Sequence, residues 1–288
     1  MSLRKRDEQG RSSEQRDALR RLVERPLLEL IPLRDVLERA EALPAGAATT
    51  VTASPTHGIE ATIELCERLA ALGHEATPHL AAHMFRDRSH LGDVLDRCRG
   101  LGLRSAFVIG GDAKDRGEFH DGLSILRALE ELGHPFASLG VAGYPEGHPS
   151  IPDDRLIAAL LDKQAHATHV TTQMTFDGGA IRSWIERIRA AGVRLPIHVG
   201  APGAVRVRRL LRVAARIGVG GSLRYLRKNR QVLQLLVPRT YTADRLLRSL
   251  GPSLTDPAAD IRALHLFTFN QVEETVGWQR RLLRELGG

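Results

Sequence analysis

A single carboxylate, Glu29, interrupts an otherwise apolar run between Leu28 and Leu30. Burying an unpaired carboxylate is costly, so this side chain must either be paired with a cation or be held in its neutral form. A carboxylic acid that stays protonated near neutral pH can donate its proton to a reacting group as a general acid. The sequence therefore allows two roles for Glu29: it is either a general acid or one partner in a structural salt bridge.

The segment 141–150, VAGYPEGHPS, ends an apolar run with rigid and polar residues. Its two prolines, Pro145 and Pro149, fix φ and remove backbone donors, so we predict a stiff loop rather than a helix. A stiff loop that carries Tyr144 and His148 is suited to holding a ligand.

Other polar residues stand at or near the ends of apolar runs, and each has a plainer alternative role. Asp112 follows a pair of glycines, which permit close approach of the backbone to a ligand but also make an ordinary turn. His79 has H-x-x-x-H spacing with His83, but Pro78 argues against a helix there, so we predict no metal site. The remaining candidates are two residues on or ending predicted strands and one helical residue: Thr52, Gln173 and Lys163.

Short apolar or β-branched runs alternate with amphipathic helical stretches along most of the chain. Apolar residues at helical spacing precede Gly73, Gly133 and Gly192, and each glycine predicts a helix end. Eight strands, each followed by a helix, predict an α/β fold of the (β/α)8 or TIM-barrel type. An open doubly wound sheet is the rival, but the glycine fingerprint expected after its first strand is missing. The eight predicted strands are 27–31, 48–53, 76–81, 105–110, 137–142, 168–173, 196–200 and 264–269.

We expect one catalytic barrel domain over residues 25–288, preceded by a charged N-terminal extension over 1–24. The interval from Gly200 to Leu264 leaves room for extra helices after the seventh strand. In such a barrel, catalytic residues gather at the rim where the carboxyl ends of the strands meet. The polar residues named above fall near those ends, so we expect them around one rim.

The net charge of +7 comes almost entirely from arginine. Residues 187–243 contain thirteen basic and no acidic residues, so this window could bind an anionic ligand or simply be a solvated surface. Nucleic-acid binding has little support, because aromatic residues make up 4% of the chain and no nucleic-acid motif is present. No apolar run approaches the roughly 20 residues that span a bilayer. The N-terminus lacks a secretory signal and the two cysteines are isolated, so we expect a cytoplasmic protein without a membrane segment.

Seven short motifs, taken in their order along the chain, resemble the methylenetetrahydrofolate reductase family from about Leu28 to Thr275. The motifs AGYPEGHP (142–149) and TTQMTFD (171–177) are specific, and the shared order adds weight to the weaker ones. The weaker motifs are LELIP (28–32), VTASP (51–55), TPHLA (77–81), GGD (110–112) and FTFN (267–270).

The resemblance implies a barrel that reduces 5,10-methylenetetrahydrofolate to 5-methyltetrahydrofolate, with hydride from NADH or NADPH passed through FAD. It places Glu29 at the general-acid position, Asp112 at the acidic position beside flavin and pterin, and Gln173 at the pterin-binding position. The rigid loop at 141–150 would then clasp the cofactor. The positions implied for cofactor contact are Thr52, His79, Gly111, Asp112, Ala142, Tyr144, His148 and Lys163.

Several positions depart from the family pattern around the flavin, among them Phe119, which stands near an expected Tyr. Gly110 stands where the family has Arg, Ala53 where it has Tyr, and Ala159 and Asp162 where Asn and Arg are usual. Two alternatives follow: a flavin-free enzyme that passes hydride directly from the nicotinamide to the folate, or a folate-binding barrel without catalysis. The basic window 187–243 could compensate by holding a phosphate or the polyglutamate tail of the folate, or it could bind nothing. The sequence leaves open the choice of NADH or NADPH and whether the chain forms a homo-oligomer.

Overall fold

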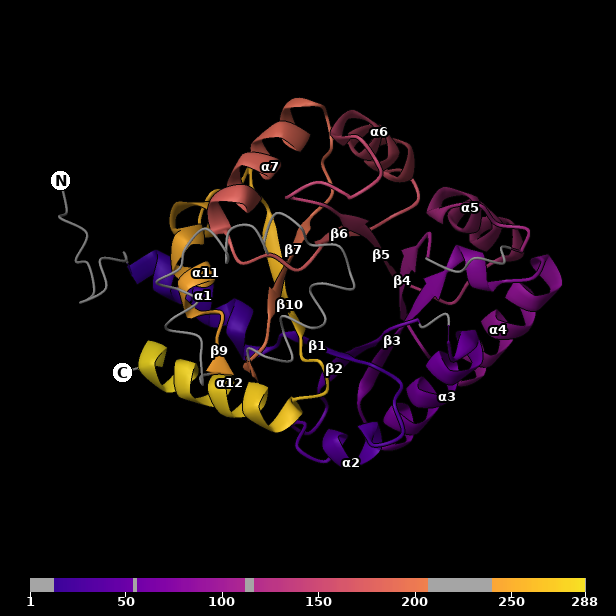
Figure 1. Cartoon of the computed structure of the whole chain (residues 1–288), viewed down its shortest axis with the longest axis horizontal. Coiled ribbons are helices and arrows are strands. Elements are labelled where there is room, and N and C mark those ends of the chain that lie inside the picture. The colour runs from indigo at the N-terminus through magenta and orange to yellow at the C-terminus, as the bar shows by residue number, and fades with distance from the viewer. Residues whose placement is uncertain (1–12, 54–55, 112–116, 207–239, 288) are drawn as a thin grey trace.

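The computed structural model describes residues 13–53, 56–111, 117–206 and 240–287, and it contains a closed barrel of eight parallel strands. Around the barrel the strand order is β1-β10-β7-β6-β5-β4-β3-β2, so the first and last strands pair and close the sheet (Figure 1). This confirms the predicted (β/α)8 fold. The barrel strands are β1 Leu27–Leu30, β2 Ala48–Val51, β3 Glu75–Ala81, β4 Ser105–Ile109, β5 Ser138–Gly143, β6 His169–Thr172, β7 Ile197–Pro202 and β10 Ile261–Phe267.

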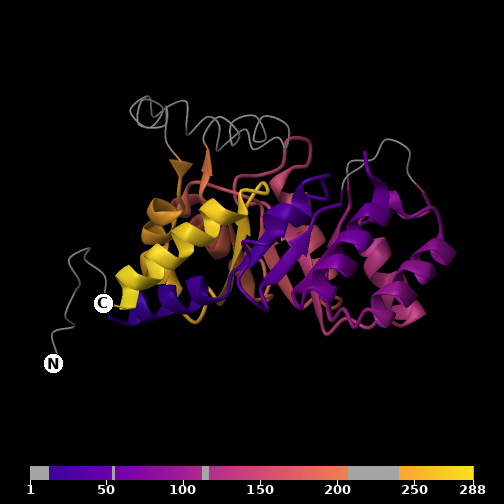
Figure 2. The same ribbon diagram turned by 90° about the horizontal axis from the view of Figure 1, so that it is seen from below.

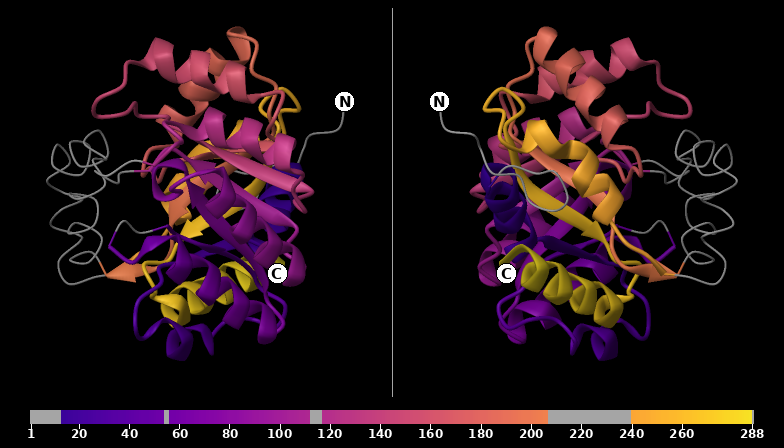
Figure 3. Two further views of the ribbon diagram at one scale, coloured as in Figure 1. Left: turned by 90° about the vertical axis from the view of Figure 1, so that its right-hand side faces the viewer. Right: turned by 90° about the vertical axis from the view of Figure 1, so that its left-hand side faces the viewer.

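Helices surround the strands in both side views of the molecule (Figure 3). Three of them begin at an aspartate whose side chain accepts a backbone N–H of the first turn, at Asp87, Asp121 and Asp177. The helices that follow barrel strands are α2 Val36–Ala40, α3 Gly58–Ala71, α4 Arg88–Gly100, α5 Gly122–Leu132, α6 Asp153–Lys163, α7 Gly178–Ala190, α11 Asp244–Leu250 and α12 Val272–Gly287.

The three glycines predicted to end helices do follow helices, and each has a positive φ. Gly73 has φ 81°, Gly133 has φ 70° and Gly192 has φ 103°. Residues with a side chain rarely adopt this region, which explains why glycine stands there.

Helix α1 (Ser13–Glu24) packs along α12, as Figure 2 shows. Leu19 and Val23 of α1 are buried, and the side-chain amide of Gln279 donates a 2.8 Å hydrogen bond to the Val23 carbonyl. Residues 1–12 lie outside the described residues, and the division of the chain at residue 24 stays a prediction.

After β7 the chain forms a small two-stranded antiparallel sheet of β8 (Val205–Arg206) and β9 (Thr240–Tyr241). Helix α11 and the 3-10 helix η2 (Gly251–Leu254) follow, in the interval where extra helices were predicted. Residues 207–239, which hold most of the basic window, lie outside the described residues. A second 3-10 helix, η1 (Ala82–Met84), follows β3. None of the helices described is both long and apolar enough to cross a bilayer.

The outward faces of the barrel strands form the main core with the helices. Leu28, Leu30, Val51, Leu80 and Val108 all belong to this core and are almost completely buried. The interior is different. Bulky aliphatic residues usually fill a barrel of this size, but here the inward positions carry many polar and ionisable side chains.

Candidate active site

Glu29 lies inside the barrel, where its side chain is about nine-tenths buried. Nε2 of His265, on the neighbouring strand β10, is 3.1 Å from its Oε2 atom. The backbone of the same segment is held by the end of β10: Thr268 donates to the Glu29 carbonyl at 2.5 Å, and Asn270 bonds to both the N–H and the carbonyl of Ile31. The strand that carries the carboxylate is therefore fixed at its carboxyl end.

His79 of β3 is the second histidine beside Glu29, with 3.9 Å between its Nε2 and Oε2 of the carboxylate. Burial lowers the pKa of His79 to about 4, and this outweighs the opposing influence of Glu29. His79 is therefore neutral at pH 7. Among the described residues, Glu29 has no lysine or arginine within ion-pair distance, so its neighbours at that distance are the two histidines.

In the loop after β5, the rings of Tyr144 and His148 pack against each other edge to face, with their centroids 5.1 Å apart. The hydroxyl of Thr175 donates to the Glu146 carboxylate at 2.8 Å, which ties this loop to the loop after β6. The sequence predicted a stiff loop at this position, and these contacts show what holds it.

Gln173 follows β6 directly, and its backbone N–H donates to the Gly143 carbonyl at 2.7 Å. Its side-chain oxygen accepts the N–H of Met174 at 2.8 Å. Since Gly143 precedes Tyr144, the structure places the Gln173 backbone beside the start of the aromatic loop, at the carboxyl ends of two adjacent strands.

Three further predicted residues occupy the same end of the barrel. Thr52 continues the β1–β2 ladder, with its N–H donating to the Leu30 carbonyl at 3.0 Å. Ala142 pairs in register with Thr171 of β6. Gly111 has φ 89°, and a Cβ added there would stand 3.0 Å from the Cβ of Ala81, so glycine fits this position for reasons of both conformation and space.

Lys163 ends α6, and its side chain reaches the start of α5. Its ammonium is 3.6 Å from the point where a Cβ on Gly122 would stand. Burial lowers the pKa of Lys163, while Asp121 and Asp162 act in the opposite direction. Within the described ranges the ammonium makes no ion pair shorter than 4 Å. A half-buried cation beside a helix N-terminus has the chemistry of an anion site.

Asp112 falls within residues 112–116, outside the described residues, so its place beside the other candidates stays a prediction. The same holds for the basic residues between 207 and 239.

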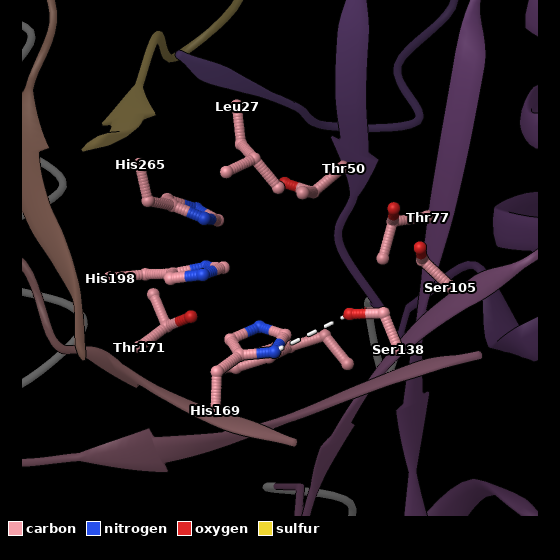
Figure 4. A pocket seen from close by; sticks show the side chains of 10 residues that line it. Leu27, Thr50, Thr77, Ser105, Ser138, His169, Thr171, His198 and His265 are labelled. Carbon is pink, nitrogen blue, oxygen red and sulfur yellow. Dashed lines mark hydrogen bonds between the residues drawn. The ribbon is translucent and has the colours of Figure 1, made fainter. Parts of the chain in front are cut away.

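Three interior histidines were missed from the sequence: His169, His198 and His265. Figure 4 shows their rings one after another along one wall of a cavity in the barrel. His198 and His265 belong to predicted strands whose other residues are mostly apolar, which is the signal that singled out Glu29 and could have found these two residues too. The predicted strand of His169 is mostly threonine and gives no such signal. In the part of the chain that is described, no three His, Cys, Asp or Glu side chains are arranged to hold a metal ion.

The family model described as methylenetetrahydrofolate reductase matches residues 32–217, which is well over half of the chain. A Caenorhabditis elegans protein named "Probable methylenetetrahydrofolate reductase (NADPH)" is 26% identical over 208 residues, covering 67% of this chain and 29% of that protein. "Methylenetetrahydrofolate reductase 1" of Schizosaccharomyces pombe is 30% identical over 118 residues, covering 37% of this chain and 19% of that protein. "Methylenetetrahydrofolate reductase 2" of Saccharomyces cerevisiae is 28% identical over 143 residues, covering 46% of this chain and 24% of that protein.

The chain thus spans less than a third of the length of these curated relatives. Among solved structures, the carboxyl transferase domain of Rhizobium etli pyruvate carboxylase superposes with a TM-score of 0.44 and 11% identity, over 99% of this chain and 52% of that chain. This likeness is too distant to inform function. Because the family model covers more than half of the sequence and the fold is a closed barrel, the chain belongs to the methylenetetrahydrofolate reductase family.

Proposed function

We propose that this protein reduces 5,10-methylenetetrahydrofolate to 5-methyltetrahydrofolate, with NADH or NADPH as the source of hydride. The observation that carries the proposal is the environment of Glu29. Its carboxyl group is buried inside the barrel and hydrogen-bonded to a histidine, with no lysine or arginine beside it among the described residues. This is an environment in which a carboxylic acid can hold and release a proton.

In the proposed reaction, Glu29 donates its proton to a nitrogen of the folate. The protonated five-membered ring opens to an electrophilic iminium, and hydride transfer to that carbon then gives the methyl group. Asp112 and Gln173 would bind the pterin, with Asp112 supporting the positive charge that develops on it. The rigid loop of Tyr144 and His148 would form one wall of the site and exclude water.

FAD is the cofactor that the family resemblance implies, and Lys163 offers a test of fit. A half-buried ammonium at the start of α5, without an ion pair among the described residues, suits a cofactor diphosphate. Lys163, Thr52, His79, Gly111, Ala142, Tyr144 and His148 would hold it. When bound, FAD would accept hydride from the nicotinamide and pass it to the folate.

A flavin-free enzyme is the second candidate, and it is favoured by Ala159 and Asp162, which stand where the family has Asn and Arg. Asp162 is exposed and places a negative charge next to Lys163, where a diphosphate would be repelled. In this version the nicotinamide would deliver hydride directly to the folate. A folate-binding barrel without catalysis is the third candidate.

Both cysteines are free and buried in the structure, in keeping with the expected cytoplasmic location.

The test is an assay of the purified protein with 5,10-methylenetetrahydrofolate and NADH or NADPH, with and without added FAD. Chromatography would identify 5-methyltetrahydrofolate, and an absorption spectrum would show any bound flavin. Product formed only by a yellow, flavin-loaded protein supports the FAD enzyme, and product formed by a colourless protein supports the flavin-free enzyme. Folate binding in calorimetry with no nicotinamide oxidation would contradict both and leave the binding barrel.

A further inference from the structure

A polar cavity occupies the barrel interior on the side of Glu29 that faces the amino ends of the strands. Its walls include Ser105, Ser138 and His169, which are the first residues of β4, β5 and β6. The space open to water-sized molecules is about 40 Å³. His265 lines this cavity and also makes the hydrogen bond to Glu29, so it connects the cavity with the carboxyl group.

The cavity wall carries buried polar atoms that have no hydrogen-bond partner among the residues that the structure describes. Thr50 Oγ1 and His198 Nδ1 are two such atoms, and Figure 4 shows both side chains at the cavity. Leaving buried polar groups unsatisfied is costly, and ordered water usually satisfies them. A cavity needs roughly 10–15 Å³ for each water, so a polar space of this size has room for about three waters.

Two histidines of the wall, His169 and His198, are uncharged at neutral pH. Burial lowers the pKa of His169 to about 4, and burial together with the neighbouring His169 and His265 lowers the pKa of His198. The His169 and His198 rings stack with centroids 3.8 Å apart, an arrangement that two cations would not tolerate. Neutral imidazoles and water offer both donors and acceptors, so they can pass a proton without holding a charge.

We propose that His265 is a proton-relay residue that returns a proton from this cavity to Glu29 after each turnover. The inference rests on the proposed function, in which reduction of the folate consumes one proton and leaves Glu29 as a carboxylate. Nε2–H of His265 gives its proton to Oε2 of Glu29, and Nδ1 takes a proton from cavity water. Bulk solvent replaces that proton through the amino-terminal end of the barrel. The ring then returns to its first tautomer by exchange with water, in which Nδ1 gives up one proton and Nε2 takes up one, with no net change in protons.

The relay explains why the proton source lies on this side of Glu29. Folate and the hydride donor would occupy the rim at the carboxyl ends of the strands and would exclude water from it during turnover. The side of the barrel at the amino ends of the strands stays available for proton exchange with water. It also gives a reason for a polar interior where aliphatic side chains would pack better.

The decisive variant is His265→Gln, since a glutamine amide can keep the hydrogen bond to Glu29 but cannot pass a proton. We expect kcat for folate reduction to fall about tenfold or more, with KM for the folate changed less than about twofold. The solvent deuterium isotope effect on kcat should rise, because proton delivery becomes limiting. An unchanged kcat and isotope effect would overturn the relay and leave His265 with a structural role.

A second variant decides the question if His265→Gln does not fold. Replacing Thr50 and Thr77 together by valine keeps the shape of the cavity wall and removes two hydroxyl groups, while the bond between His265 and Glu29 stays intact. A lowered kcat with a raised isotope effect is expected. The matched control is Thr49→Val, which changes the outward neighbour on the same strand, whose hydroxyl bonds to the Glu75 carbonyl.

The relay and the proposed function fail in different ways. A wild-type protein that makes no 5-methyltetrahydrofolate contradicts the proposed function, and the relay with it. A wild-type protein that is active, with a valine double variant equal to the Thr49→Val control, contradicts the relay alone.

Discussion

Nε2 of His265 lies 3.1 Å from Oε2 of Glu29, across the pair of strands that closes the barrel. The two residues are 236 positions apart in sequence, on the first and last barrel strands. The hydrogen bond therefore forms only when the chain has folded into a closed barrel. Any change that opens the β1–β10 seam should separate Glu29 from His265 as well as lower stability.

Acid should destabilise the protein through its buried histidines. The pKa values of His79 and His169 are both lowered to about 4 in the fold, from 6.5. Between these values the unfolded chain binds protons that the native protein does not, so the free energy of unfolding must fall as pH drops from 6.5 to 4. The loss is on the order of 3 kcal/mol for each histidine, a large part of a typical total of about 5–15 kcal/mol.

Urea unfolding measured at several pH values between 7 and 4 checks this expectation. His169→Asn should flatten the slope, since an amide can replace the Nδ1 contact with Thr168 and does not titrate. His120→Gln, on an exposed side chain, should leave the slope unchanged. A free energy of unfolding that stays constant across this range would show that the interior histidines are not held neutral by burial.

Gly200 on β7 is a position where the barrel wall has no room for a side chain. A Cβ there would stand 2.1 Å from the carbonyl oxygen of Thr172, a backbone atom that cannot move without shifting β6. Gly200→Ala should therefore lower the free energy of unfolding by about 1–3 kcal/mol. The control, Gly92→Ala, lies inside α4 with nothing within 4 Å of the new Cβ, and it should raise that free energy by about 0.5–1 kcal/mol. Equal effects of the two variants in thermal or urea unfolding would contradict the close approach of β6 and β7.

Lys163 should contribute to cofactor binding if FAD is the cofactor. Lys163→Met keeps most of the apolar stem and removes the charge, so the affinity for FAD should fall about tenfold, equivalent to about 1.4 kcal/mol. Arg187→Met removes an exposed cation that pairs with Asp153 and should leave FAD affinity unchanged. Titration followed by flavin fluorescence measures both. Equal affinities in the wild type and Lys163→Met would mean that Lys163 does not hold the diphosphate.

The sequence was sufficient to predict the barrel because local signals agree with the global fold. Each barrel strand overlaps one of the predicted runs, and glycines end the helices between them as expected. The short strands β8 and β9 were not predicted. They contain two residues each and pair across a long stretch of sequence, so neither periodicity nor a turn motif indicates them.

The interior of the barrel was harder to predict than its strands. A parallel strand is buried on both faces, so its sequence does not show which alternate residues point inward. Glu29 stood out because a carboxylate must find a partner, but the identity of that partner depends on strand register. His265 and His79 come from β10 and β3, and only the closed barrel brings them to Glu29. The cavity beneath them is likewise formed by residues from many strands, and no local motif encodes it.

The most direct measurement compares Glu29→Gln with the wild type in the formation of 5-methyltetrahydrofolate. Glutamine has nearly the shape of glutamic acid but cannot donate a carboxyl proton, so the rate should fall by about 10²–10⁴ while circular dichroism shows an intact fold. Glu75→Gln, on an exposed carboxylate that pairs with Arg25, should keep the wild-type rate. If Glu29→Gln folds normally and still forms the product at the wild-type rate, Glu29 is not the proton donor.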